Sequence, residues 1–152
     1  MESRLQRLRV SVRVSHPLGT LMSMDHPWRR LRDLTDWRLD WQQLPTGTDA
    51  QIDWRGHTIT VDLRLSQAQR RSTLAHELEH VASGPAPAWD RDREGVRVER
   101  AAARRLVTLD ELVDAARWTR YPDELWIDAD MLDALVDGLT PAERAAVEAA
   151  ID

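Results

Sequence analysis

The chain has 152 residues, of which 42% are hydrophobic and 31% are charged, and its formal net charge is −5. This length fits one compact domain, and the absence of any run of roughly 20 apolar residues argues against a membrane-spanning helix. Because the chain has no cysteine, disulfides and cysteine-ligated metal are excluded, and the mild acidic balance argues against a protein that binds nucleic acid through bulk electrostatics.

Residues 1–35 are expected to form an N-terminal segment that packs on the domain formed by residues 36–152. The start of this segment interleaves arginine with apolar residues and lacks the uninterrupted apolar block of a secretory signal, which favours a cytoplasmic protein. Its apolar residues alternate over 8–14, as in a strand, and have helical spacing over 28–34.

Between residues 37 and 65 the apolar side chains recur at every second position, as they do in strands. One alternating run covers 37–41. Two more, at 52–54 and 58–61, flank Arg55-Gly56, which is typical of a tight hairpin turn. The pattern predicts a small antiparallel sheet.

The remainder of the chain has the signals of helices. Ser66 is a good N-cap for a helix over 67–82, which Gly84 and Pro85 would end, and a polar loop follows over 84–93. Further helices are expected at 94–107, after the capping pair Thr108 and Glu111, at 129–138 and after Thr140-Pro141. A sheet followed by helices predicts an α+β fold in which a helical bundle carries the functional site.

The helix over 67–82 contains the pentad His76-Glu77-Leu78-Glu79-His80. Two histidines four residues apart lie on one face of a helix, where both rings can reach a single zinc ion. Glu77 points about 100° away from His76, so it is placed to take a proton from a water on the open side of the metal. Zinc lowers the pKa of such a water to about 7, and the pattern therefore predicts hydrolase chemistry with Glu77 as general base.

Three protein ligands are expected, with the fourth position left for water. The best third ligand is Glu99, because it shares a predicted helix face with Ala102, Ala103 and Leu106. A buried, unpaired carboxylate is costly, and a metal ion relieves that cost. The alanines also allow this helix to approach the pentad helix closely.

Three more acidic residues could serve as the third ligand in place of Glu99. Glu94 is the second choice, followed by Asp90 and Asp92. All three are expected in or beside the polar loop, where solvated charge is the simpler interpretation.

Several further residues near the pentad have weaker functional interpretations. Glu79 is interpreted as a solvent-facing helix residue, and Arg70-Arg71 as partners of nearby acids. His57 and Tyr121 are alternative residues for stabilising an oxyanion, although a packing role is the simpler interpretation for both. Trp89 is a weak candidate for lining the cleft.

The segment from about Thr58 to Leu112 resembles the ImmA/IrrE family of metallopeptidases. In that family a β-hairpin leads into an arginine-containing helix start and the pentad, and a second helix carries Glu-x-x-Ala ahead of paired aliphatic residues. The corresponding residues are Gly56-His57-Thr58-Ile59, the run from Gln69 to Val81, and Glu99-Arg100-Ala101-Ala102 before Leu106-Val107. Glu79 departs from the family, which often has glycine at that position.

The resemblance implies a zincin-like, gluzincin-type metallo-endopeptidase of the short, stand-alone type found in phages and mobile elements. His76, His80 and Glu99 would be the zinc ligands and Glu77 the general base. The expected substrate is a helix-turn-helix transcriptional repressor, with no membrane partner and no direct nucleic-acid binding. The alternatives are a catalytically inactive protein that binds a repressor through the same fold, and a hydrolase that acts on something other than protein.

Overall fold

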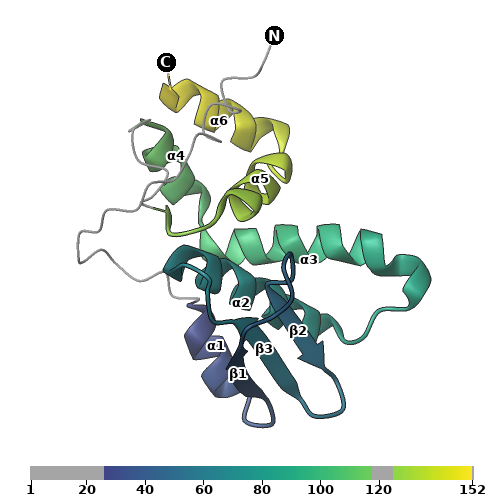
Figure 1. Cartoon of the computed structure of the whole chain (residues 1–152). Coiled ribbons are helices and arrows are strands. Elements are labelled where there is room, and N and C mark those ends of the chain that lie inside the picture. Colours follow the sequence, from purple (N-terminus) through teal and green to yellow (C-terminus); the bar gives the residue numbers. More distant parts are fainter. Residues whose placement is uncertain (1–25, 118–124, 152) are drawn as a thin grey trace.

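The computed structural model describes residues 26–117 and 125–151 (Figure 1). A short helix and three strands come first, and helices follow. In chain order the elements are α1 Pro27–Asp33, β1 Arg38–Gln42, β2 Ala50–Asp53, β3 Thr58–Asp62, α2 Gln67–Ser83, the 3₁₀ turn η2 Ala88–Asp90, α3 Arg91–Leu106, α4 Leu109–Arg117, α5 Ala129–Asp137 and α6 Pro141–Ile151. The α+β fold class predicted from the sequence is confirmed. The strand predicted over 8–14 and the break at Tyr121-Pro122 lie outside the described residues.

The sheet is mixed, so the prediction of an antiparallel sheet is wrong in part. The strand order is β1-β3-β2, and β2 and β3 form the predicted antiparallel hairpin. β1, however, pairs with β3 in parallel, with Leu39 opposite Ile59. The connection after β1 leads to β2 at the opposite edge of the sheet, and the chain then returns to form β3 between them. The alternation of apolar residues within a strand does not show which other strand that strand pairs with.

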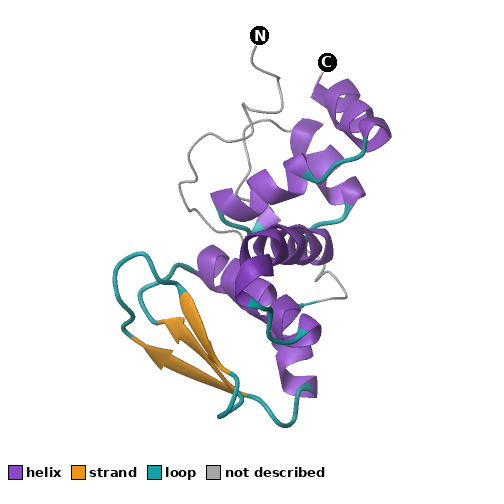
Figure 2. Cartoon of the chain, turned by 90° about the vertical axis from the view of Figure 1, so that its right-hand side faces the viewer, coloured by secondary structure: helices purple, strands orange, loops and turns teal. Residues whose placement is uncertain are grey.

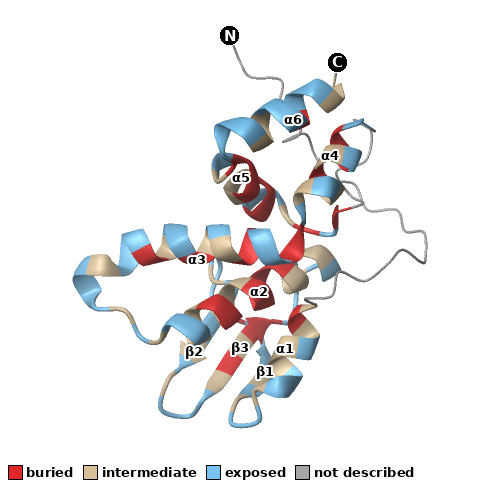
Figure 3. Cartoon of the chain, turned by 180° about the vertical axis from the view of Figure 1, so that it is seen from behind, coloured by how far each residue is buried: buried red, intermediate tan, exposed pale blue. Residues whose placement is uncertain are grey.

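Two buried clusters lie on either side of the pair formed by α2 and α3. The first joins one face of the sheet to α1 and α2 and is centred on Ile59, Val61, Leu74 and Leu78. The second joins the C-terminal half of α3 to α4, α5 and α6. Figure 2 shows the strands as a layer on one side of the helices, and Figure 3 shows buried residues concentrated on β3, α2 and α5. The helices α2 and α3 therefore lie between the two clusters.

The predicted starts and ends of α2, α4, α5 and α6 agree closely with the structure. The Ser66 hydroxyl accepts a hydrogen bond from the Gln69 backbone N–H, and the Gln69 side chain accepts one from the Ser66 N–H, which completes a capping box. Gly84 ends α2 with φ of 77°, a value that favours glycine. Thr108 and Thr140 cap α4 and α6 as predicted.

The helix α3 begins at Arg91, three residues before the predicted start at residue 94, and η2 precedes it directly. The polar sequence of this stretch favours a loop, and its helical pattern is not visible from hydrophobic spacing. An ion pair of 2.8 Å between Arg97 and Asp90 joins the second turn of α3 to η2. Glu94 consequently lies within the first turn of α3 rather than at the boundary of the loop.

Candidate metal centre

The helix α2 places the two histidines of the pentad side by side. The Nε2 atoms of His76 and His80 are 3.0 Å apart, and the ring centroids are 4.7 Å apart. Two nitrogen ligands of one tetrahedral zinc ion, each about 2.0–2.1 Å from the metal, are about 3.3 Å apart. The separation of the two Nε2 atoms is therefore close to the separation that a shared ion needs.

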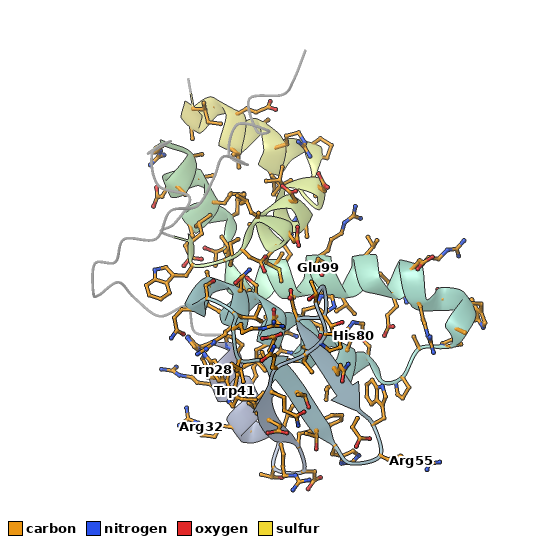
Figure 4. The ribbon with its side chains drawn as sticks, viewed as in Figure 1. Trp28, Arg32, Trp41, Arg55, His80 and Glu99 are labelled. Carbon is orange, nitrogen blue, oxygen red and sulfur yellow. The ribbon has the colours of Figure 1, made fainter. Side chains whose placement is uncertain are left out.

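The helix α3 brings two carboxylates to these rings. The Glu99 Oε2 atom lies 2.5 Å from Nδ1 of His76, and the Glu94 Oε1 atom lies 3.4 Å from Nδ1 of His80. These pairs show that α3 crosses α2 in the opposite direction, with Glu99 and His80 at the crossing in Figure 4. Small buried residues of both helices, Ala75, Ala102 and Ala103, belong to one apolar cluster beside the crossing, as the sequence predicted for α3.

The burial of the two glutamates is the reverse of the expectation. The Glu94 side chain is 9% exposed, whereas the Glu99 side chain is 29% exposed. The interpretation of Glu94 as a solvated charge in or beside the loop is therefore wrong, because the residue is buried and faces His80 of α2. Both glutamates contact the Nδ1 atoms, on the side of each ring away from the pair of Nε2 atoms.

Asp90 and Asp92, the two aspartates considered for the third ligand, lie at the start of α3. Asp90 is engaged by Arg97, and Asp92 is exposed. Among the residues that the structure describes, no three His, Asp or Glu side chains are gathered in an arrangement that could hold a metal ion.

Burial and neighbouring charges shift the protonation of the pentad. Burial raises the pKa of the Glu77 carboxyl above its usual 4.5, although the two histidines oppose this rise. Burial lowers the pKa of His76, but the hydrogen bond and charge of Glu99 oppose this, and the net pKa is raised above 6.5. A carboxyl whose pKa is raised toward neutrality is suited to accept a proton and to return it.

Asp128 is a neighbour of the pentad that the sequence did not indicate. Its carboxylate caps α5 by accepting a hydrogen bond of 2.9 Å from the Met131 N–H, and its own N–H donates to the Ser72 hydroxyl at 3.0 Å. Burial, with the charge of Glu99 among others, raises the pKa of Asp128 to about 6. The position of Asp128 before an expected helix is typical of a helix cap. Its hydrogen bond with Ser72 of α2, however, depends on tertiary packing and has no signal in the sequence.

Glu79 is buried, so its interpretation as a solvent-facing residue is wrong. Its Oε1 atom lies 2.9 Å from Nη1 of Arg30 and 2.6 Å from Nε of Arg105. Glu79 thus joins α1, α2 and α3 one residue before His80, and the two arginines offset the cost of burying its charge.

Within residues 26–117 and 125–151, neither Arg70 nor Arg71 forms the ion pair with an acid that the sequence predicted. Arg71 donates hydrogen bonds to the backbone carbonyls of Leu106, Leu125 and Trp126, at 3.0, 2.8 and 3.0 Å. Arg70 donates to the Leu63 carbonyl and lies over the Trp41 ring, 4.9 Å from its centroid. Arg71 is therefore a structural link between α2 and two distant segments.

The candidate oxyanion residues gain no support. His57 lies in the hairpin turn with φ of 46°, stacked on Trp37 at 4.9 Å. Arg55, in the same turn, is well away from His80 and Glu99 in Figure 4. Trp89 is 81% exposed, and Tyr121 lies outside the described residues.

No family model, no curated protein and no solved structure matches this chain. The evidence for a metal centre therefore consists of the pentad and of the positions of its side chains. In the described part of the chain, no helix combines the length and the apolar character that crossing a membrane requires.

Proposed function

We propose that this protein is a zinc-dependent endopeptidase whose metal is held by His76, His80 and Glu99. The observation that carries the proposal is the pair of Nε2 atoms 3.0 Å apart beside the partly buried carboxyl of Glu77. These residue types suit zinc, which accepts neutral imidazole nitrogen and carboxylate oxygen in hydrolytic sites. In the structure the Glu99 carboxylate faces Nδ1 of His76, so it has to turn toward the two Nε2 atoms to complete the three-ligand set. When bound, zinc supplies a Lewis acid that polarises a peptide carbonyl and acidifies water.

In this proposal each residue of the site has a distinct task. His76 and His80 present Nε2 to the metal because both rings project from one face of α2. Glu77 takes the proton of the attacking water and then delivers it to the nitrogen of the leaving amine. The burial that raises the pKa of Glu77 favours both transfers near neutral pH.

Glu99 is proposed as the third ligand, and Glu94 is the alternative. Glu99 is favoured by its match to the Glu-x-x-Ala pattern and by the greater exposure of its side chain, 29% against 9% for Glu94. A metal that must meet both water and substrate needs ligands at an open face. Glu99 satisfies this requirement better than Glu94.

The proposed substrate is a helix-turn-helix repressor in the cytoplasm, which follows from the resemblance of the pentad and the Glu99 helix to the ImmA/IrrE family. The alternative is a regulatory protein that binds such a repressor without cleaving it. The location of both carboxylates at Nδ1 rather than beside Nε2 is the observation that favours this alternative.

The experiment measures cleavage of a purified repressor by the zinc-loaded protein, the Glu77→Gln variant and the Glu148→Gln variant. Glu148 is exposed on α6 and provides the same chemical change away from the site. We expect cleavage by the wild type and by Glu148→Gln and a loss of at least about 100-fold with Glu77→Gln, in line with the contribution of general-base catalysis. Equal cleavage by all three proteins would refute the role of Glu77, and binding without cleavage would favour the regulatory alternative.

A further inference from the structure

We propose that Glu94 is a positioning residue for His80: the Glu94 carboxylate accepts a hydrogen bond from the Nδ1–H of His80 and so directs Nε2 of that ring toward the metal. This inference rests on the proposed zinc site and names a residue that the three-ligand set does not include. It follows from the chemistry of the imidazole ring and from three features of Glu94 itself.

A neutral histidine that gives its Nε2 lone pair to a metal must carry its proton on Nδ1. Metal-ligating histidines almost always donate this proton to a carboxylate, a carbonyl or water, which fixes the tautomer and the ring orientation. At His80, the group facing Nδ1 is the carboxylate of Glu94, 3.4 Å away. A good charge-assisted hydrogen bond is about 2.7–2.9 Å long, so the contact is expected to shorten when the ring is fixed by a metal.

Burial makes Glu94 suited to this task. Its side chain is 9% exposed, and a carboxylate at that depth needs a compensating partner. Arg97, one turn later on α3, is hydrogen-bonded to Asp90 at 2.8 Å and also feels the charge of Glu94. The contact of Glu94 at ion-pair distance in the described ranges is with the His80 ring.

The position of Glu94 in α3 provides a second source of stabilisation. Glu94 belongs to the first turn of this helix, where the unpaired N–H groups and the helix dipole favour negative charge. The ion pair between Arg97 and Asp90 fixes this turn against η2. Glu94 is therefore held by a structured helix start rather than by a loop.

The two glutamates consequently have different tasks. Glu99 is the more exposed of the two, as a ligand near an open coordination position should be. Glu94 is buried behind the ring of His80, where it can orient the ring but lies away from the solvent side. Removing a ligand should change the coordination of the metal, whereas removing a positioning residue should weaken binding but leave the coordination unchanged.

The test measures Zn²⁺ affinity by competition with a chelator for the wild type, Glu94→Ala, Glu94→Gln, Glu99→Gln and Asp92→Asn. Asp92, an exposed acid in the same turn of α3, is the matched control. We expect Glu94→Ala to bind zinc about 10- to 100-fold more weakly, as loss of an orienting partner does. Glu94→Gln should recover part of the loss because its amide oxygen still accepts the Nδ1 proton, and Asp92→Asn should stay within about 2-fold.

Spectroscopy separates positioning from ligation. The Nδ1 proton of His80 should give a resolved NMR signal in the zinc-loaded wild type, and this signal should exchange rapidly in Glu94→Ala. Cobalt-substituted Glu94→Ala should keep the absorption spectrum of the wild type. Glu94→Ala that binds zinc as tightly as Asp92→Asn, with the His80 signal unchanged, would overturn the inference.

Two further outcomes also decide the matter. Loss of stoichiometric zinc and an altered cobalt spectrum with both Glu94 variants, but not with Glu99→Gln, would make Glu94 the ligand and overturn its positioning role. A wild type that binds no zinc would refute the proposed function itself, and the positioning inference with it. Circular dichroism of each variant verifies that the fold is retained.

Discussion

The hydrogen bonds of Arg71 predict a large and specific loss of stability when this side chain is removed. Its guanidinium links α2 to the end of α3 and to the segment before α5 by donating to three backbone carbonyls, two of them in partly buried surroundings. Replacing Arg71 with methionine keeps much of the apolar stem but leaves these carbonyls without their charged donor. Because the carbonyls of Leu106, Leu125 and Trp126 lose a shared donor, the end of α3 and the segment before α5 should both be held less firmly against α2.

The magnitude follows from the two partly buried hydrogen bonds. A hydrogen bond to a charged group contributes about 1.5–3 kcal/mol, and the exposed third bond to the Trp126 carbonyl contributes little. We therefore expect Arg71→Met to lose about 3–5 kcal/mol of unfolding free energy. At about 2–4 °C per kcal/mol for a chain of this size, Tm should fall by roughly 6–20 °C.

The assay is chemical denaturation followed by circular dichroism, with Arg70→Met as the matched control. Arg70 makes one exposed hydrogen bond to the Leu63 carbonyl and a cation–π contact with Trp41, so its loss should cost about 1 kcal/mol. A loss for Arg71→Met that is no larger than the loss for Arg70→Met would refute the structural role assigned to Arg71.

Three further predictions concern stability. The hydrogen-bonded ion pair with Arg104 lowers the pKa of Glu143 from 4.5 to about 2, so the stabilisation by this pair is present above pH 4.5 and is lost as the pH falls toward 2. In urea denaturation, the unfolding free energies of the wild type and Glu143→Gln should converge over this pH range. A difference that stays constant with pH would contradict the assignment. Ser66→Ala should lose about 1 kcal/mol by removing the α2 cap, whereas Ser83→Ala, at the exposed end of the same helix, should lose less than half of that in thermal denaturation. Glu79→Gln should lose about 1–3 kcal/mol of unfolding free energy because the ion pairs of the buried Glu79 with Arg30 and Arg105 lose their negative charge, and an unchanged unfolding free energy would contradict this role.

Features that depend on neighbours in sequence were predictable. Ser66 and Gln69, like Thr108 and Glu111, form caps from residues three apart, and Gly84 ends its helix through its own backbone. The pairing of the histidine rings follows from the same local logic, since residues four apart share a helix face. Local patterns were therefore sufficient to predict most of the helices, the β2–β3 hairpin and the two-histidine arrangement, but not η2 or the first residues of α3.

Features that depend on tertiary packing, such as the burial of a charged side chain or the pairing of a strand, were not predictable. Glu94 and Glu79 are polar residues with no burial signal in the sequence, yet one lies under α2 and the other between two arginines from different helices. The parallel pairing of β1 with β3 likewise depends on where the chain returns. The burial of a charge or the neighbour of a strand is set by tertiary packing, which periodicity does not contain.

The most direct test of the zinc site is calorimetric titration of metal-free protein with Zn²⁺, comparing the wild type with the double variant His76→Ala/His80→Ala. The 3.0 Å separation of the two Nε2 atoms predicts one zinc ion bound per wild-type chain and none bound by the folded double variant. Zinc binding that persists in the double variant, or a wild type that binds none, would contradict the proposed metal centre.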